Sequence, residues 1–163
     1  MTWRVEDRAN EPPDSRTFVI EESLGYLVNR AARAFAHRLS AELRSFDVGI
    51  GQWAVLMHLW SQDGMTQAQL ARRVAIEQPT MVRTIDRMER DGLVTRAPDP
   101  DDGRASRISL TDRGWALRDQ LVPLAAGVNR SATAALTDEE VATLRGLLAR
   151  LDRDDTVAEA SSP

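Results

Sequence analysis

The chain of 163 residues contains no cysteine, so it can form no disulfide, thiolate nucleophile, zinc–thiolate site or cysteine redox switch. Histidine is scarce: His37 and His58 each fall in an apolar predicted helix, where a packing or surface role is commoner than catalysis or metal binding. Neither a glycine-rich phosphate loop nor a His-Glu-x-x-His spacing occurs. These absences argue against an enzyme and a metal protein, and we expect no cofactor.

Long apolar runs are missing as well. No stretch approaches the ~18–20 apolar residues that cross a bilayer. The first residues, Met1–Asp7, lack the apolar core of a secretion signal. We therefore expect a cytoplasmic protein without a membrane partner.

Lysine is also absent, and all 21 basic residues are arginine. The formal net charge is −4, but acidic residues gather at the two ends of the chain. Residues 23–151 hold 17 arginines against 15 acidic residues. Arginine presents a planar fork of donors that suits phosphate and guanine. This distribution is compatible with a nucleic-acid partner for the central part of the chain.

The most informative stretch begins at Ile76. Met81, Ile85 and Met88 recur at i, i+4 and i+7, which predicts one buried helical face. Pro79 suits a first helical turn, and Gly92 suits a left-handed cap, so we expect a helix from Gln78 to Gly92.

Side chains at the start of this helix are candidates for base contacts. Gln78, Thr80 and Arg83 are best placed to reach base edges, where arginine pairs with guanine and glutamine with adenine. Arg87 lies beside them on the exposed side. The alternative is an ordinary surface helix with solvated charges.

A shorter helix precedes it. Thr66 and Gln69 match a capping box at its start, and the link to the next helix is as short as the turn of a helix–turn–helix. Arg72 and Arg73 lie near the end of this first helix and are candidate phosphate contacts.

Two β-prone runs follow, at residues 93–96 and 107–110, separated by a loop rich in Asp, Pro and Gly. This pattern predicts a hairpin with a long tip. Asp102 could hold Arg104 or the hairpin backbone and leave an arginine aimed at a narrow minor groove. Arg107 is a further candidate DNA contact. A helix for the major groove followed by a basic hairpin is the layout of a winged helix–turn–helix.

These motifs resemble the MarR family of bacterial regulators, and most of all its SlyA-type branch. The resemblance is carried by Ile-Glu-Gln-Pro-Thr-x-Val-Arg-Thr at 76–84, by Gly-Leu-Val-x-Arg at 92–96, and by Asp102, Arg104, Leu110 and Thr111. It covers residues 22–153. It implies that Pro79, Thr80 and Arg83 meet bases and that Arg104 is the wing arginine. Gly103 departs from the branch, which often has a second arginine there.

The rest of the chain reads as helices. After a loose arm at 1–20, which includes Trp3, we expect helices at 21–46 and 52–61, the first being broken by Gly49 and Gly51. Beyond the hairpin, Thr111 should cap a helix to about Ser131 with a kink at Pro123. A capping box at Thr137 opens a last helix to residue 153, and 154–163 form an acidic tail.

The predicted fold is therefore mainly α with a small β-hairpin wing. Residues 51–111 would form the winged helix–turn–helix, and 21–48 with 112–153 a helical dimerisation region. The terminal helices carry more apolar surface than this small domain can cover, and we expect a homodimer that reads palindromic DNA. The resemblance supports the dimer; packing of the two ends within one chain is the alternative. The candidate interface residues are Leu24, Leu27, Phe35, Leu144, Leu148 and Leu151.

Trp53 and Met57, one helical turn apart, are candidates for a ligand pocket between the dimerisation helices and the DNA-binding part, with core packing as the alternative. By resemblance, the effector is a small aromatic acid. We expect a dimeric, ligand-modulated transcriptional regulator, acting as a repressor where its operator overlaps a promoter, with activation through the same contacts as the alternative. The alternatives are a helical dimerisation module with a degenerate wing and a small-molecule sensor with secondary DNA binding. Arg83 and Arg104, both present, favour DNA binding.

Overall fold

The computed structural model describes residues 19–100 and 102–158, with side-chain surroundings up to Leu151. Trp3, almost all of the predicted arm and the last residues of the predicted tail lie outside these ranges. The helices and strands are α1 (Leu24–Leu43), α2 (Ile50–Ser61), β1 (Met65–Thr66), α3 (Gln67–Val74), α4 (Gln78–Arg90), β2 (Val94–Pro98), β3 (Ser106–Leu110), α5 (Asp112–Ala132) and α6 (Asp138–Ala158). Single 3₁₀ turns, Ile20–Glu22 and Arg44–Phe46, flank α1.

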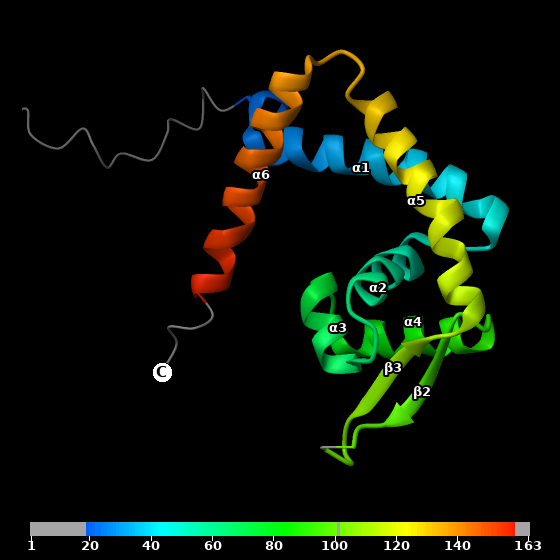
Figure 1. The fold of residues 1–163 in the computed structure, drawn as a ribbon. Coiled ribbons are helices and arrows are strands. Elements are labelled where there is room, and N and C mark those ends of the chain that lie inside the picture. The colour runs from blue at the N-terminus through cyan, green and yellow to red at the C-terminus, as the bar shows by residue number, and fades with distance from the viewer. Residues whose placement is uncertain (1–18, 101, 159–163) are drawn as a thin grey trace, which may run out of the picture.

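Helices α2, α3 and α4 form a lobe with the small sheet, and the β2–β3 hairpin projects from it (Figure 1). Helix α5 rises from this lobe and packs along α1, which lies on the side away from the hairpin (Figure 1). The predicted class, mainly helical with a small wing, is confirmed.

The core of the lobe consists of the apolar faces that the sequence pattern predicts. Met81, Ile85 and Met88 of α4 are fully buried, as is Leu70 of α3. Burying each such side chain contributes roughly 1.5–3 kcal/mol, so the exposed polar face of α4 is held in place by its own apolar face.

The ends of α4 have the expected chemistry. Pro79 lies in the first turn, where its missing N–H has no helical partner. Gly92 has a φ of 67°, the left-handed conformation that glycine adopts without strain. The helix proper ends at Arg90, two residues earlier than predicted, because Asp91 and Gly92 form the cap.

The sheet has one strand more than the predicted hairpin. Its order is β1-β3-β2, and all pairs are antiparallel. β1 is only two residues long, with Met65 opposite Ile108, and is too short to give a period-two pattern. It ties the start of α3 to the wing.

The starts of α1 and α2 also differ from the sequence expectation. α1 begins at Leu24 because the Ser23 hydroxyl accepts the Tyr26 N–H at 3.3 Å, and residues 21–22 form a separate 3₁₀ turn. α2 begins at Ile50 and includes Gly51, which we expected to lie before the helix and to interrupt helical structure. The Gln52 side chain accepts the Gly49 N–H at 2.8 Å and so caps this helix.

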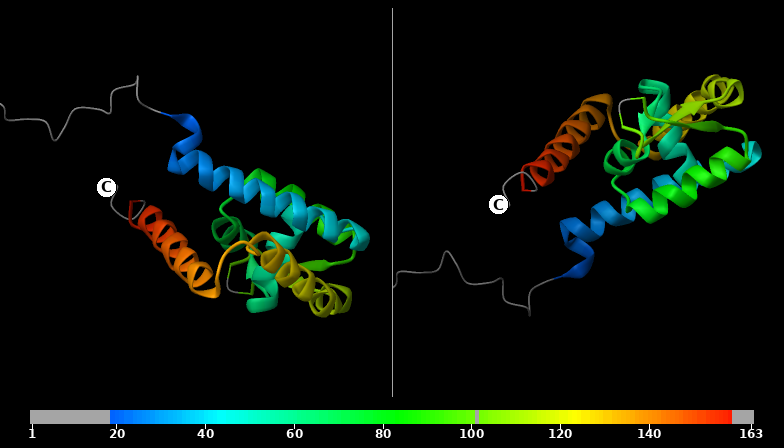
Figure 2. Two further views of the ribbon diagram at one scale, coloured as in Figure 1. Left: turned by 90° about the horizontal axis from the view of Figure 1, so that it is seen from above. Right: turned by 90° about the horizontal axis from the view of Figure 1, so that it is seen from below.

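The last two helices are capped as predicted. Thr111 accepts the Gly114 N–H at 3.1 Å, and Pro123 lies inside α5. Thr137 and Glu140 form a reciprocal capping box, whose hydrogen bonds hold the pKa of the Glu140 carboxyl below its usual value. α6 extends to Ala158, into the region predicted as tail, and Figure 2 shows it standing apart from α1.

Candidate DNA interface and ligand cavity

The face of α4 opposite the buried methionines is open to solvent. It carries the side chains predicted to meet DNA: Gln78, Pro79, Thr80, Arg83 and Arg87, all exposed. Within the described ranges no acidic side chain pairs with Arg83. The guanidinium of Arg83 therefore has its donors available for a partner outside the chain.

Helix α3 contributes two further exposed arginines. Arg73 donates to the Gln62 side-chain oxygen at 3.1 Å, while Arg72 is exposed in the same turn. Both lie in the last turn of α3, next to the left-handed Ala75 that begins the turn to α4.

The base of the wing is fixed to α4 by two ion pairs that no sequence motif predicted. Arg96 on β2 approaches Asp86 at 2.7 Å and Glu89 at 3.6 Å. Because Asp86 and Glu89 lie on α4, wing and recognition helix are oriented together.

Arg107 was a candidate DNA contact, but its guanidinium is engaged inside the wing. Its Nε lies 3.0 Å from the buried Asp99 carboxylate, and its NH1 donates to the Gly64 carbonyl at 3.3 Å. These bonds join β3, the end of β2 and the loop before β1. Arg107 thus braces the hairpin.

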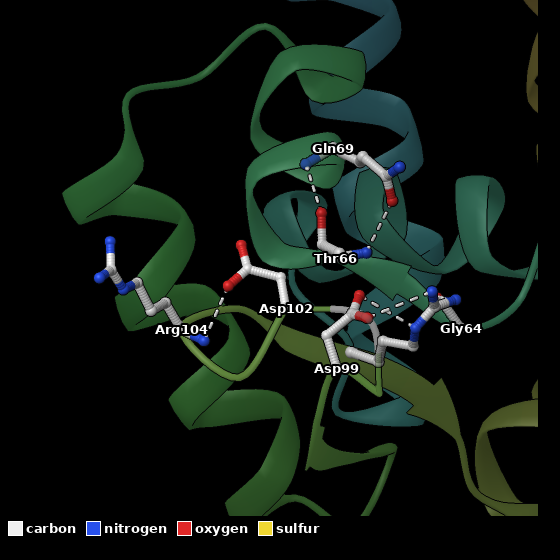
Figure 3. A network of polar contacts seen from close by, with 7 residues as sticks. Gly64, Thr66, Gln69, Asp99, Asp102 and Arg104 are labelled. Atoms are coloured by element: carbon white, nitrogen blue, oxygen red, sulfur yellow. Dashed lines mark hydrogen bonds and ion pairs between the residues drawn. The ribbon is translucent and has the colours of Figure 1, made fainter.

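At the wing tip, Asp102 holds the hairpin backbone, the second of the two roles predicted for it. The Asp102 carboxylate accepts the backbone N–H of Arg104 at 3.0 Å. The Arg104 side chain extends away from the Asp99–Gly64 cluster, as Figure 3 shows. A cavity of about 280 Å³ separates the wing tip from the starts of α3 and α4, and its lining includes Thr66, Gln78 and Arg104. Wing and helix starts therefore face one shared recess.

A larger cavity, of about 840 Å³, lies between α1, α2 and α5. Both predicted ligand residues, Trp53 and Met57, line it. Trp53 is 6% exposed and packs edge-on against Trp60, with ring centroids 5.6 Å apart, so it also belongs to the core. Phe35, predicted for the dimer interface, lines this cavity too.

Arg118 on α5 is the cationic side chain among the lining residues, and no sequence motif indicated it. It lies far from Trp53 in the chain, so no local spacing connects the two. The cavity therefore combines an apolar wall with one guanidinium, which suits a small organic anion.

The apolar residues of the terminal helices stay exposed. The stripe on α6 comprises Leu144, Leu147, Leu148 and Leu151, and Leu24 and Leu27 lie open on α1. The two ends do not pack together in one chain, as Figure 2 shows. In the described part of the chain, no group of three potential metal ligands occurs and no helix is long and apolar enough to span a membrane.

Comparison with known proteins agrees with this geometry. The model of the MarR family matches residues 50–106. A probable transcriptional regulator from Pseudomonas aeruginosa is 33% identical, with a TM-score of 0.75 over 82% of this chain and 99% of that one. A mutant of MarR from E. coli, complexed with operator DNA, is 29% identical, with a TM-score of 0.74 over 78% of this chain and 92% of that one.

A third similar structure is that of BpsR from Bordetella bronchiseptica, in which 6-hydroxynicotinic acid regulates DNA binding. It is 25% identical, with a TM-score of 0.77 over 83% of this chain and 96% of that one. Motifs, fold and relatives agree that the chain belongs to the MarR family of transcriptional regulators.

Proposed function

We propose that this protein is a homodimeric repressor that binds a palindromic operator and is released by a small aromatic acid. The observation that carries the proposal is the shared face of α4 and the wing, where the guanidinium groups of Arg83 and Arg104 pair with no acidic side chain among the described residues. The motif at residues 76–84 supports a place in the SlyA-type branch.

In this proposal α4 enters the major groove. Gln78, Pro79, Thr80 and Arg83 meet base edges, and Arg72, Arg73 and Arg87 meet phosphates. Arg104 enters the flanking minor groove, where Asp102 shapes the tip and Arg107 braces the hairpin without touching DNA.

The unpartnered leucine stripe on α6 and the open residues of α1 support a dimer. A two-fold axis through these helices would give two copies of α4, as a palindromic site requires. In this arrangement residues 51–111 form the DNA-binding domain, and 21–48 with the helices after residue 112 form the dimerisation region.

Selection of bound duplexes from a random pool tests the DNA-binding part of the proposal. We expect an inverted repeat with half-sites one helical turn apart, and a protein–DNA complex containing two chains by sedimentation. A selected motif without two-fold symmetry, or a complex with a single chain, contradicts the proposal. Failure to enrich any sequence rejects sequence-specific binding outright.

The cavity supports the effector proposal. Its apolar wall, which includes Trp53 and Met57, suits an aromatic ring, and Arg118 suits a carboxylate. The small aromatic acid named for BpsR supports the same ligand class. Because the cavity touches α1, α2 and α5, a ligand there can change how the lobe sits against the dimerisation helices.

Salicylate at constant ionic strength is the probe for this class. We expect salicylate to quench tryptophan fluorescence and to weaken operator binding. In Arg118→Gln, both effects should require a salicylate concentration that is at least about tenfold higher. Arg145→Gln on α6, away from the cavity, is the matched control and should respond as the native chain does. If salicylate, benzoate and 6-hydroxynicotinate all leave operator binding unchanged, an aromatic acid is not the effector.

A further inference from the structure

A buried amide links the cavity-lining helix α2 to the recognition helix. Gln52 is 3% exposed, and both ends of its side-chain amide are used. Its Oε1 accepts the Gly49 N–H at 2.8 Å, and its Nε2 donates to Asp91 Oδ2 at 2.7 Å. Asp91 is the C-terminal cap residue of α4, so this bond joins two elements that are distant in sequence.

The same carboxylate oxygen also faces an arginine on the DNA side. Arg87 Nε lies 3.6 Å from Asp91 Oδ2, one helical turn earlier. Arg87 follows Thr80 and Arg83 at spacings of seven and four residues, so the three lie along one side of α4. Gln52 and Arg87 therefore both approach the same carboxylate oxygen of Asp91.

The two interactions differ in strength. The bond from Gln52 is short and its donor is buried, whereas the Arg87 side chain is 62% exposed and its ion pair is long. An exposed pair of this kind holds its partners weakly. With Asp91 bound to Gln52, Arg87 is free to exchange the carboxylate for a DNA phosphate.

We propose that Gln52 is a positioning residue for DNA binding: its bond to Asp91 keeps this carboxylate turned toward α2 and leaves Arg87 available for phosphate. Loss of the bond lets Asp91 turn to Arg87 and neutralise it. The inference rests on the proposed DNA-binding function and adds a residue that touches no DNA.

An exchange of donor and acceptor tests the bond. In Gln52→Glu, studied at a pH at which the new carboxyl group is ionised, this group still accepts the Gly49 N–H but repels Asp91 toward Arg87. Adding Asp91→Asn restores a hydrogen bond, with the donor now on residue 91. Asp91→Asn alone keeps an acceptor for Gln52 and leaves Arg87 without a carboxylate.

The measurement is the salt dependence of binding to a duplex selected by the native protein. The slope of log K against log salt concentration changes by about 0.9 for each phosphate contact. We expect Gln52→Glu to reduce the slope by this amount per subunit, the double variant to restore it, and Asp91→Asn alone to leave it at least as steep. Arg87→Ala should show the same reduction, and Gln52→Glu should add nothing to it.

Gln120→Glu, at an exposed position of α5, is the matched control. It changes the net charge by the same amount as Gln52→Glu, and residue 120 does not contact Asp91. The proposal is overturned if Gln52→Glu keeps the native slope, if the double variant does not restore it, or if the control lowers it as much. Loss of the fold in Gln52→Glu leaves Asp91→Asn as the deciding variant, and a shallower slope there refutes the proposal.

A measurement on the free protein separates this inference from the proposed function. Hydrogen exchange of the Arg87 Nε–H, followed by NMR, should be slower in Gln52→Glu than in the native chain and in the double variant. Equal exchange in all three overturns the inference even if the operator is bound as proposed. Failure of the native chain to prefer any sequence rejects the proposed function, while this exchange measurement still decides the role of Gln52.

Discussion

Replacing Gly114 with alanine should destabilise the protein and weaken DNA binding together. Gly114 lies in the first turn of α5, the helix that follows β3. A Cβ at this position would overlap the Leu93 carbonyl oxygen and lie 3.0 Å from Leu110 Cδ2. The Gly114 carbonyl also accepts the buried Trp60 Nε1–H at 3.0 Å, so the turn cannot move away freely.

The magnitude follows from two opposing effects. Overpacking a tight site costs about 1–3 kcal/mol, and the upper end applies because the obstructing atom belongs to the backbone. Removing a helical glycine returns about 0.5 kcal/mol. We expect a net loss of about 2–2.5 kcal/mol, which corresponds to a melting temperature about 4–10 °C lower for a chain of this size.

Gly51→Ala is the matched control. Gly51 also lies in a first helical turn, on α2 of the same lobe, and an added Cβ there meets nothing within 4 Å. The free energy of unfolding of Gly51→Ala should be about 0.5 kcal/mol higher than that of the native chain.

Urea unfolding at one protein concentration checks the sign and size of both changes. Operator affinity should also fall in Gly114→Ala, because the Leu93 carbonyl lies just beyond the cap of α4. If Gly114→Ala is as stable as Gly51→Ala with an unchanged m-value, the close approach of α5 to the wing is not rigid and the reasoning fails.

Three further predictions concern the proposed interface and dimer. Arg83→Ala should weaken specific binding by about 1–3 kcal/mol and flatten the base preference at one position per half-site; equal losses on specific and random duplex would reduce Arg83 to a phosphate contact. Arg104→Ala should lose most affinity on operators with A·T-rich flanks, and a deficit independent of flank composition would exclude minor-groove reading. Leu148→Glu should abolish the two-chain species in sedimentation and collapse operator binding; a variant that stays dimeric would move the interface elsewhere.

Local chemistry let the sequence predict the recognition helix closely. Proline in a first turn, a left-handed glycine and apolar residues at i, i+4 and i+7 act within a few residues, and α4 runs from Gln78 to a cap at Gly92. The capping boxes at Thr66 and Thr137 are equally local, and both are present. The wing motif indicated the family because its residues also lie close together in the chain.

The tertiary structure decided the rest, because it depends on residues that are distant in the chain. The bond from Gln52 to Asp91 spans 39 positions, and the one from Arg107 to the Gly64 carbonyl spans 43. No spacing rule connects such pairs, so the sequence predicted neither the contact of Arg107 with Gly64 nor the place of Arg118 in the cavity that Trp53 lines. Residue type and spacing in the sequence determined which side chains could bind DNA. Packing determined which of these side chains keep their hydrogen-bond donors available.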